Sequence, residues 1–238
     1  EIYTLSLHDA LPISSWANSP LQVELTLVAM ASHNSKHASR EHMKTFYKSI
    51  DEIKEEYFDG TILTGAPIEQ IPFEEVDYWS ELCEIFEFAN THVYSNMFIC
   101  WGAQAALYYY YGIQKHQLQE KVFGVFEHKV TRPHNPLVRG FDEIFYAPHS
   151  RHTEVSLEEL KKHEELRILA ASPETGAHIV STENGRQIFI LGHQEYDKDT
   201  LAQEYFRDVN KGLTIEPPKN YFKDRKSTRL NSSHPAGS

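Results

Sequence analysis

The chain has 238 residues and a formal net charge of −11, and 40% of its residues are hydrophobic and 24% charged. This length is enough for one sizeable α/β domain, the acidic balance argues against a nucleic-acid partner, and no apolar run approaches the roughly 18 residues of a membrane span. Two cysteines without a paired framework indicate a reducing, cytoplasmic compartment.

Both ends of the chain look foreign to the folded domain. Residues 1–14 and 225–234 resemble translated sequencing-adapter sequence, so we interpret 1–14 and 223–238 as non-native tails. A signal peptide is the alternative for the start, but the segment opens with Glu1, carries Asp9 and lacks both a cationic region and a long apolar region. An ordinary disordered basic end is the alternative for the C-terminus.

Between these ends, apolar periodicity alternates between strand-like and helix-like segments. In chain order, strands are expected over 21–28, 59–65 and 97–100, and helices over 40–57, 74–89 and 101–111, the last stopped by Gly112. Further strands are expected over 122–126, 144–146, 168–170, 178–181 and 187–191, and a last helix over 199–209. Asn184-Gly185, between the last two strands, is a hairpin signal.

Strands that alternate with helices in the first half predict right-handed βαβ units and a mostly parallel sheet, and therefore an α/β fold. Ligands of such sheets bind at the carboxyl ends of the strands. Thr64-Gly65, Cys100 and Gly192-His193 all fall at such ends, which predicts one shared site.

Cys100 lies at a predicted strand-to-helix turn, between the apolar run 97–99 and the small residues that open the next helix. A cysteine at such a turn holds its sulfur at the carboxyl edge of the sheet. There the helix N-terminus stabilises a thiolate, and backbone N–H groups can hold an oxyanion. We interpret Cys100 as a nucleophile, the alternative being a small core hydrophobe. Cys83, on the apolar stripe of its helix, is interpreted as such a core residue.

His193 and Glu195 follow the apolar run 187–191 and are the candidate partners of this cysteine. An imidazole beside a carboxylate can act as a general base that the carboxylate orients. The alternative is a pair on a surface loop, because the spacing is not specific by itself.

Two other segments rich in histidine or tyrosine are given no chemistry. His33, His37 and His42 have a spacing that suggests metal ligands, but no cysteine or carboxylate pattern accompanies them, so we expect solvated side chains and no metal site. The four tyrosines 108–111 cannot all face one way on a helix, so some are expected to pack and some to stay in water.

Several motifs, in order along the chain, resemble the homoserine O-acyltransferases of methionine biosynthesis, which include acetyl- and succinyl-transferring members. These motifs are Asn18-Ser19-Pro20-Leu21-Gln22-Val23, Phe58-Asp59-Gly60, Thr64-Gly65-Ala66-Pro67, Phe73-Glu74-Glu75-Val76-Asp77-Tyr78-Trp79, Cys100-Trp101-Gly102-Ala103-Gln104, Ala147-Pro148-His149-Ser150-Arg151 and Gly192-His193-Gln194-Glu195-Tyr196-Asp197. The resemblance implies a three-layer α/β/α fold like that of the class I glutamine amidotransferases (flavodoxin-like). It also implies a homoserine O-acyltransferase domain over 15–222, incomplete at both ends relative to the family.

The resemblance further implies roles for single residues. Cys100 matches the acyl-thioester nucleophile, His193 the proton acceptor and Glu195 the third catalytic residue. The positions that match substrate-binding residues of the family are Lys121, Ser150 and Arg207. Without the family, these three would be interpreted as a surface charge, a turn residue and one side of a helix salt bridge.

Glu69 matches the position that sets acyl-CoA specificity in this family, and Ser150 is assigned to specificity as well. A glutamate at that position resembles the acetyl-transferring members. Succinyl-CoA carries an additional carboxylate, and placing it against Glu69 in a partly desolvated pocket would cost several kcal/mol at an effective dielectric of about 20. We therefore expect acetyl-CoA as the acyl donor, with succinyl-CoA as the alternative.

The expected function is transfer of an acetyl group from acetyl-CoA to the γ-hydroxyl of L-homoserine through an acyl-Cys100 intermediate, giving O-acetyl-L-homoserine. Acetyl-CoA is then a co-substrate, no further cofactor is expected, and the family likeness implies a homodimer. One rival is glutamine hydrolysis, disfavoured because Phe98 stands two positions before Cys100, where amidotransferases usually have a glycine. The other rival is an inactive truncated fragment.

Overall fold

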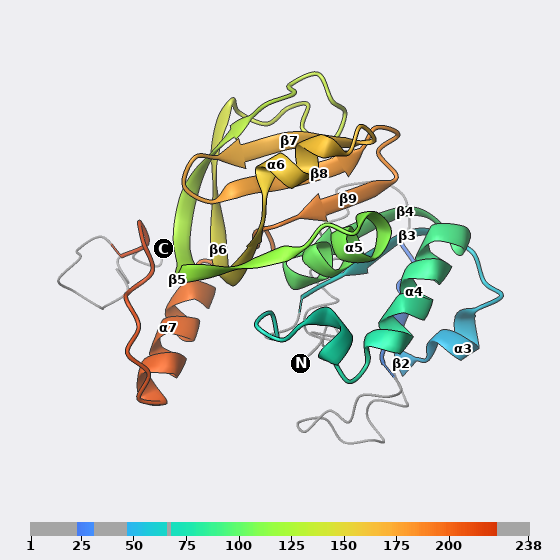
Figure 1. The fold of residues 1–238 in the computed structure, drawn as a ribbon, viewed down its shortest axis with the longest axis horizontal. Coiled ribbons are helices and arrows are strands. Elements are labelled where there is room, and N and C mark those ends of the chain that lie inside the picture. Colours follow the sequence, from blue (N-terminus) through green and yellow to red (C-terminus); the bar gives the residue numbers. More distant parts are fainter. Residues whose placement is uncertain (1–22, 31–46, 66–67, 223–238) are drawn as a thin grey trace, which may run out of the picture.

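The computed structural model describes residues 23–30, 47–65 and 68–222 (Figure 1). Some of the sequence predictions concern residues outside these ranges. They are the two tails, the first part of the expected helix 40–57, Ala66-Pro67, and the histidines His33, His37 and His42.

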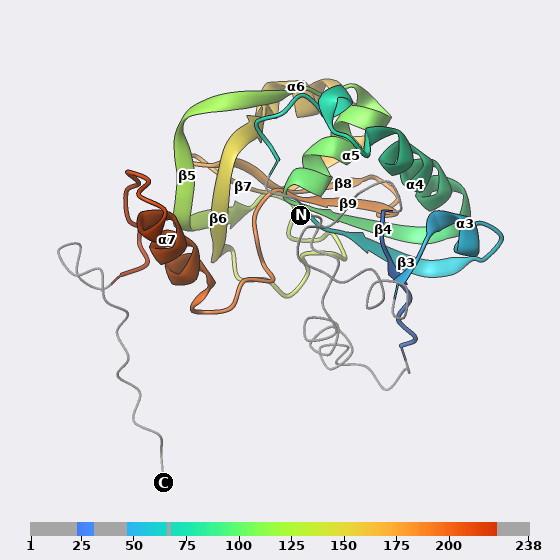
Figure 2. The same ribbon diagram turned by 90° about the horizontal axis from the view of Figure 1, so that it is seen from below.

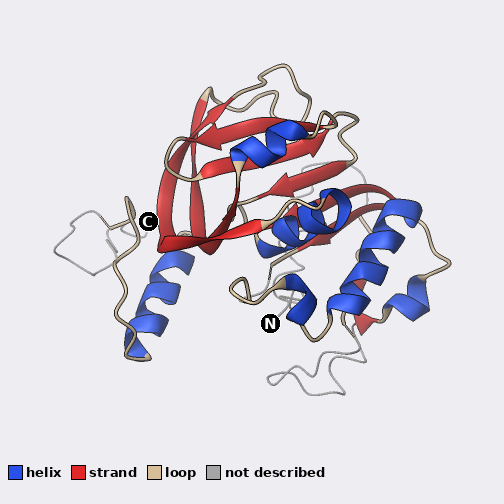
Figure 3. Cartoon of the chain, viewed as in Figure 1, coloured by secondary structure: helices blue, strands red, loops and turns tan. Residues whose placement is uncertain are grey.

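Seven strands form one sheet in the order β3-β4-β9-β8-β7-β5-β6. Figure 3 shows the strands in red and the helices in blue. Their bounds are β3 (Phe58–Leu63), β4 (Val93–Ile99), β5 (Lys115–Val130), β6 (Ile144–Val155), β7 (Leu166–Ser172), β8 (Gly176–Thr182) and β9 (Gln187–Ile190). Strand β4 pairs in parallel with β3 and with β9, whereas all other neighbours in this sheet are antiparallel. The predicted α/β fold is confirmed, but the sheet is mixed rather than mostly parallel.

Short turns join β7 to β8 and β8 to β9 as hairpins, whereas residues 131–143 join β5 to β6 and residues 156–165 join β6 to β7. Gly185, in the predicted Asn184-Gly185 turn, has a φ of 71° and joins β8 to β9. Gly176, with a φ of 73°, follows the turn between β7 and β8. The runs 122–126 and 144–146, predicted as short strands, are parts of β5 and β6, which have 16 and 12 residues and pair along much of their length.

The helices are α3 (Ile50–Ile53), the 3₁₀ turn η1 (Phe73–Glu75), α4 (Trp79–His92), α5 (Trp101–Tyr111), α6 (Leu157–Lys162) and α7 (Thr200–Asn210). Figure 2 shows α3 to α6 above one face of the sheet, with α7 beside β5 and β6. The helix predicted over 101–111 is confirmed as α5, and Gly112 ends it with a φ of 68°. No helix in the described part of the chain has both the length and the apolar character needed to cross a bilayer.

The N-terminal part of the chain differs from the sequence prediction. Within its described residues, the strand expected over 21–28 is reduced to β1 (Leu27–Val28), which pairs in parallel with β2 (Tyr47–Lys48). The helical spacing expected up to residue 57 yields only the four residues of α3. Such short elements take their conformation from neighbouring contacts more than from local propensity.

Aromatic side chains fill the space between α4, α5 and the sheet. Trp101, Phe86 and Phe98 are almost fully buried, and Phe98 stacks on Phe189 of β9 with ring centroids 5.3 Å apart. The four tyrosines 108–111 all lie half-buried against this core. Cys83, predicted to be a core residue, is only half-buried. The core fixes α5 against β4 and β9 and thereby positions the turn at Cys100.

Candidate active site

Cys100 forms the turn between β4 and α5. Its φ of 53° and ψ of −119° are unusual for a non-glycine residue. Its N–H donates to the carbonyl oxygen of Ile190 at 2.7 Å, and its own carbonyl oxygen accepts from the N–H groups of Ala103 and Gln104 at 3.0 and 3.2 Å. These bonds tie the turn both to β9 and to the first turn of α5.

Two glycines let the chain after β3 approach this turn closely. A Cβ atom on Gly65 would lie 2.9 Å from the backbone nitrogen of Trp101 and 3.2 Å from the Cβ of Cys100. A Cβ atom on Gly102 would lie 2.9 Å from the carbonyl oxygens of Leu63 and Thr64. The predicted meeting of Thr64-Gly65 with Cys100 at one edge of the sheet is therefore present in the structure.

His193 and Glu195 lie on the loop that follows β9. His193 Nδ1 is 2.6 Å from Glu195 Oε1, and the His193 side chain is 12% exposed. His193 also makes a hydrogen bond with the side chain of Cys100. The structure thus brings the three predicted catalytic residues together in the order cysteine, histidine, carboxylate.

The electrostatics of the loop favour a charged histidine. Burial by itself lowers the pKa of His193, but the charge and hydrogen bond of Cys100 and the carboxylate of Glu195 outweigh it, so that the pKa lies well above its usual value. An imidazolium held between a thiolate and a carboxylate is the arrangement that activates a cysteine nucleophile.

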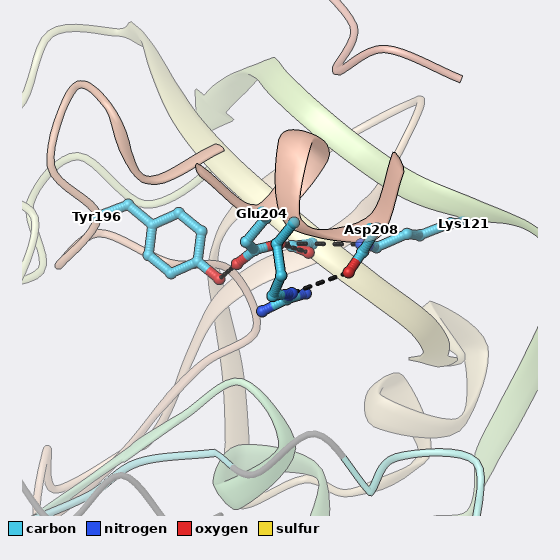
Figure 4. Close-up of polar contacts among 6 residues, drawn as sticks. Lys121, Tyr196, Glu204 and Asp208 are labelled. Carbon is cyan, nitrogen blue, oxygen red and sulfur yellow. Dashed lines mark hydrogen bonds and ion pairs between the residues drawn. The ribbon is translucent and has the colours of Figure 1, made fainter. Parts of the chain in front are cut away.

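A second polar group lies beside the triad and is centred on Glu204 of α7 (Figure 4). Ser150 Oγ donates to Glu204 Oε2 at 2.6 Å, Lys121 Nζ lies 3.8 Å from the same oxygen, and the hydroxyl of Tyr196 donates to Glu204 Oε1. The ring of Tyr196 stacks on that of His193, with centroids 4.2 Å apart. Lys121 and Ser150, predicted to bind substrate, therefore share one carboxylate, which Tyr196 connects to His193.

Arg207, the third predicted substrate-binding residue, lies at the edge of this group. Its side chain is 53% exposed, and its Nε donates to Asp208 Oδ1 at 2.8 Å. Burial raises the pKa of Asp208, but the hydrogen bond from Arg207 and the positive charges of Arg207, Lys121 and Lys211 together outweigh it, so the pKa is lowered. Because Arg207 follows Glu204 by three residues on α7, both side chains leave the helix on the same face.

Glu69, the predicted specificity residue, reaches the site through side chains of β6 and α5. Thr153 Oγ1 lies 3.3 Å from Glu69 Oε2 and 2.7 Å from Gln104 Oε1, and one hydroxyl proton can serve only one of these acceptors at a time. Lys115 lies within electrostatic range of Glu69: burial lowers the pKa of this lysine to about 8, against the opposing charge of Glu69.

Three buried histidines, one each from β5, β6 and β8, lie against the loop that carries His193. One ring nitrogen each of His128, His149 and His178 lies within 4.8 Å of the others, which by residue type could hold a metal ion. The donor chemistry argues against it. The Nε2 atoms of His128 and His149 face each other at 3.0 Å, and Arg151 Nε lies 3.4 Å from His149 Nδ1, so a dication there would adjoin a guanidinium.

Sequence reasoning does not single out Glu204, Tyr196 or the buried histidines. One sequence feature could have pointed to Glu204 as a site residue: it lies three residues before Arg207 on a predicted helix. Tyr196 lies in the same motif as His193 but carries no chemistry that spacing alone would reveal. The histidines come from three strands that are far apart in sequence, so no spacing marks them as a cluster.

Comparison with known proteins identifies the relatives of this chain. The profile of the family described as homoserine O-succinyltransferase matches residues 13–234. A homoserine O-acetyltransferase of Clostridium acetobutylicum is 56% identical over 207 residues, which are 87% of this chain and 69% of that protein. A homoserine O-acetyltransferase of Acetivibrio thermocellus is 54% identical over 212 residues, which are 89% of this chain and 70% of that protein.

Solved structures of glutamine amidotransferases share the fold at low sequence identity. One from Thermotoga maritima superposes with a TM-score of 0.52 at 14% identity and covers 74% of this chain and 77% of its own. One from Methylobacillus flagellatus has a TM-score of 0.51 at 12% identity and covers 68% of this chain and 63% of its own. The class I amidotransferase-like fold is thereby confirmed. Together with the family profile and the relatives above 50% identity, the chain belongs to the homoserine O-succinyltransferase family of acyltransferases.

Proposed function

We propose that this chain transfers an acetyl group from acetyl-CoA to the γ-hydroxyl of L-homoserine through an acyl-Cys100 intermediate. The observation that carries the proposal is the contact of Cys100, at the positive-φ turn before α5, with a His193 that is bonded to Glu195 at 2.6 Å. A strained turn that presents a nucleophile to a base is typical of enzymes that form acyl intermediates.

In the first half-reaction, the Cys100 thiolate attacks the thioester carbonyl of acetyl-CoA. The N–H groups of Trp101 and Gly102 precede those of Ala103 and Gln104, which bond to the carbonyl oxygen of Cys100, and they are placed to hold the oxyanion. The carbon–sulfur bond to CoA breaks, and the CoA sulfur takes the proton of His193. The products are acetyl-Cys100, free CoA and a neutral His193.

In the second half-reaction, neutral His193 takes the proton of the homoserine γ-hydroxyl while the oxygen attacks acetyl-Cys100. Glu195, at 2.6 Å from His193 Nδ1, keeps the other ring nitrogen facing the substrate. Collapse of the tetrahedral intermediate releases O-acetyl-L-homoserine and restores the thiolate beside a protonated His193.

The polar group around Glu204 supplies complementary charges for an amino acid. A carboxylate such as Glu204 suits the α-ammonium of homoserine, and the guanidinium of Arg207 suits its α-carboxylate in a bidentate pair. Lys121, 17% exposed in its side chain, adds a second cation beside Glu204. Because Tyr196 links Glu204 to His193, substrate held here would have its γ-hydroxyl near the base.

The choice of acetyl-CoA rests on Glu69 and on the printed names of the relatives. Relatives that are 51–56% identical to this chain are named homoserine O-acetyltransferase, although the family description names succinyl transfer. A second carboxylate near Glu69 is repelled in a partly desolvated site. Succinyl-CoA is the alternative donor.

Glutamine hydrolysis is the second candidate function, because solved structures with this fold are glutamine amidotransferases. Phe98 weighs against it, because amidotransferases usually have a glycine two positions before the nucleophile, whereas here the ring of Phe98 is fully buried against Phe86. Ammonia released from glutamine, and lost in a Cys100→Ala variant, would establish this rival.

Mass spectrometry of the chain mixed with one acyl donor at a time tests the proposal. Acetyl-CoA without homoserine is expected to acetylate the peptide that contains Cys100, and homoserine is expected to remove the adduct. Succinylation of Cys100 instead would contradict the choice of donor. An adduct on another residue, or an adduct that homoserine does not discharge, would contradict the mechanism.

A further inference from the structure

The catalytic loop, residues 191–195, is fixed to two neighbouring strands on either side of His193. The N–H of Leu191 donates to the carbonyl oxygen of His178 on β8 at 2.8 Å. The N–H of His193 donates to the carbonyl oxygen of Pro148 on β6 at 2.9 Å. The position of His193 over Cys100 therefore depends on the side chains that hold β6 and β8 in place beneath the loop.

Two histidine rings form the floor of the catalytic loop at Gly192. A Cβ atom added to Gly192 would lie 2.8 Å from His178 Nδ1 and 2.9 Å from His149 Cε1, closer than real Cβ atoms approach other atoms. Two residues after Gly192, the side chain of Gln194 also contacts this floor: its Nε2 lies 3.2 Å from His178 Nε2. The backbone of the loop thus rests directly on the two rings, with no side chain between them.

The hydrogen bonds of the cluster assign its protons. His128 Nδ1 lies 2.9 Å from the carbonyl oxygen of Phe126, so Nδ1 carries the proton and Nε2 accepts. His149 Nε2 donates to that nitrogen across 3.0 Å, beside the hydroxyl of Thr175 at 3.2 Å, which leaves His149 Nδ1 to accept from Arg151 Nε at 3.4 Å. This chain from Arg151 to Phe126 is complete only when both rings are neutral.

Burial keeps the rings neutral. All three histidines are 0% exposed. Burial lowers the pKa of His128 to about 4 and that of His178 to about 3, and it holds the pKa of His149 well below its usual value, with the charge of Arg151 acting in the same direction. At neutral pH the cluster is therefore an uncharged layer between the Arg151 guanidinium and the catalytic loop.

We propose that His149 is a positioning residue for the catalytic His193. Its ring contacts the backbone at Gly192 and connects Arg151 to His128 through hydrogen bonds. The ring therefore sets the distance between the catalytic loop and Cys100. A phenyl ring at this position would keep the floor and break the bridge, whereas a glutamine would keep a donor toward His128. The inference rests on the proposed roles of Cys100 and His193.

The rate of alkylation of Cys100 by iodoacetamide tests this role without any acyl donor. Mass spectrometry of the Cys100 peptide keeps Cys83 out of the measurement. Since an imidazolium favours the thiolate at acid pH, we expect His149→Phe to lower the alkylation rate at about pH 6, relative to that at about pH 9, by about tenfold. We expect a smaller loss in His149→Gln and none in His116→Gln, an exposed histidine on β5.

Two further variants, Gly192→Ala and His193→Gln, allow the proposal to be tested even if His149→Phe does not fold. Gly192→Ala would push the catalytic loop away from the rings of His149 and His178, and it is expected to lower the same ratio of alkylation rates. His193→Gln removes the base itself: an unchanged ratio in that variant would refute the proposed function. Suppose that the ratio of alkylation rates falls in His193→Gln but not in Gly192→Ala, nor in His149→Phe if that variant folds. Only the positioning role would then be overturned. If Zn²⁺ raises the melting temperature of the chain but not that of His149→Gln, the cluster is a metal site and the positioning role is overturned.

Discussion

At the scale of single residues, the backbone of Cys100 has a φ of 53°, a conformation that costs a non-glycine residue about 1–3 kcal/mol. Its N–H bond to Ile190 and the burial of Trp101 hold the turn in that conformation. The gain is chemical, because the turn places the buried side chain of Cys100 beside His193 at the N-terminus of α5.

Removal of the Cys100 sulfur is expected to abolish acyl transfer. Loss of a covalent nucleophile typically lowers kcat by about 10³-fold or more, so Cys100→Ala should leave turnover near background in a coupled assay of CoA release. Cys83→Ala, at the half-buried cysteine of α4, is the matched control and should retain activity. Substantial turnover in Cys100→Ala would exclude an acyl-cysteine intermediate.

Replacement of Glu69 is expected to change the preference between acyl donors. Without its charge, the repulsion of the succinyl carboxylate falls, so Glu69→Ala should raise kcat/KM for succinyl-CoA relative to acetyl-CoA by about tenfold, which corresponds to about 1.4 kcal/mol. Glu159→Ala removes a partly exposed carboxylate that pairs with His116 and should leave the ratio unchanged. An unchanged ratio in Glu69→Ala would remove the electrostatic basis of donor choice.

Glu204→Gln is expected to weaken homoserine binding without slowing acylation of Cys100. The amide cannot neutralise Lys121 or the substrate ammonium, so the KM for homoserine should rise by about tenfold while acyl-enzyme formation keeps its rate. Glu183→Gln, at an exposed ion pair with Arg167, is the control. A slower acylation step with unchanged KM would place Glu204 in the triad chemistry rather than in substrate binding.

At the scale of elements, the site depends on how closely the end of β3 approaches the start of α5. Gly65 and Gly102 allow this approach, since a Cβ on either would lie within 3.0 Å of backbone atoms. The parallel pairing of β3, β4 and β9 places their carboxyl ends at the same edge of the sheet, where β9 delivers the catalytic loop next to Cys100.

A methyl group at Gly102 is therefore expected to disturb both stability and the turn. Gly102→Ala places Cβ 2.9 Å from the carbonyl oxygens of Leu63 and Thr64, and such overpacking typically costs about 1–3 kcal/mol of unfolding free energy. Gly60→Ala on β3, whose Cβ would meet only one atom at 3.5 Å, is the control and should be near neutral in urea unfolding. Equal stability of the two variants would show that α5 can shift without penalty.

At the scale of the whole molecule, the buried histidines make stability depend on pH. The folded-state pKa values of His128 and His178 are lowered to about 4 and about 3, so the unfolded chain binds more protons than the folded chain between about pH 6.5 and these values. Their contribution to stability is complete above about pH 6.5 and is lost as the pH falls. His193 has the opposite sign: its raised pKa contributes stability that is present below about pH 6.5 and lost as the pH rises through the folded value.

The unfolding free energy is accordingly expected to fall on acidification by up to about 1.4 kcal/mol per pH unit for each buried histidine. Urea unfolding at a series of pH values from about 7 to about 5 measures this slope. His128→Gln should remove the contribution of one histidine to the slope, and Gln117→Ala, at an exposed residue of β5 that does not titrate, should leave the slope unchanged. The same slope in all three chains would mean that the cluster does not titrate on unfolding.

Local chemistry made part of this molecule predictable. The run 97–99 followed by Cys100 and small residues yields β4, the turn and α5, and the adjacent His193 and Glu195 meet because they share one short loop. The hairpin at Asn184-Gly185 is likewise local, since Gly185 supplies the positive φ that the turn needs. The directions of β5 to β8 were not predictable in this way, because hairpins and crossovers leave similar apolar runs in the sequence.

The family, the strand-to-helix turn at Cys100 and the pairing of His193 with Glu195 could all be predicted from the order of the amino acids alone. These features are fixed by residues that are close along the chain or by motifs in order. Three features became visible only in the folded chain: β4 lies between β3 and β9, Glu204 contacts Lys121, Ser150 and Tyr196, and buried histidines from three strands lie beneath the catalytic loop. They could not be predicted, because such partners are set by which strand faces and helix sides pack together. That choice depends on burial summed over the whole core and leaves no periodic signal in any one segment.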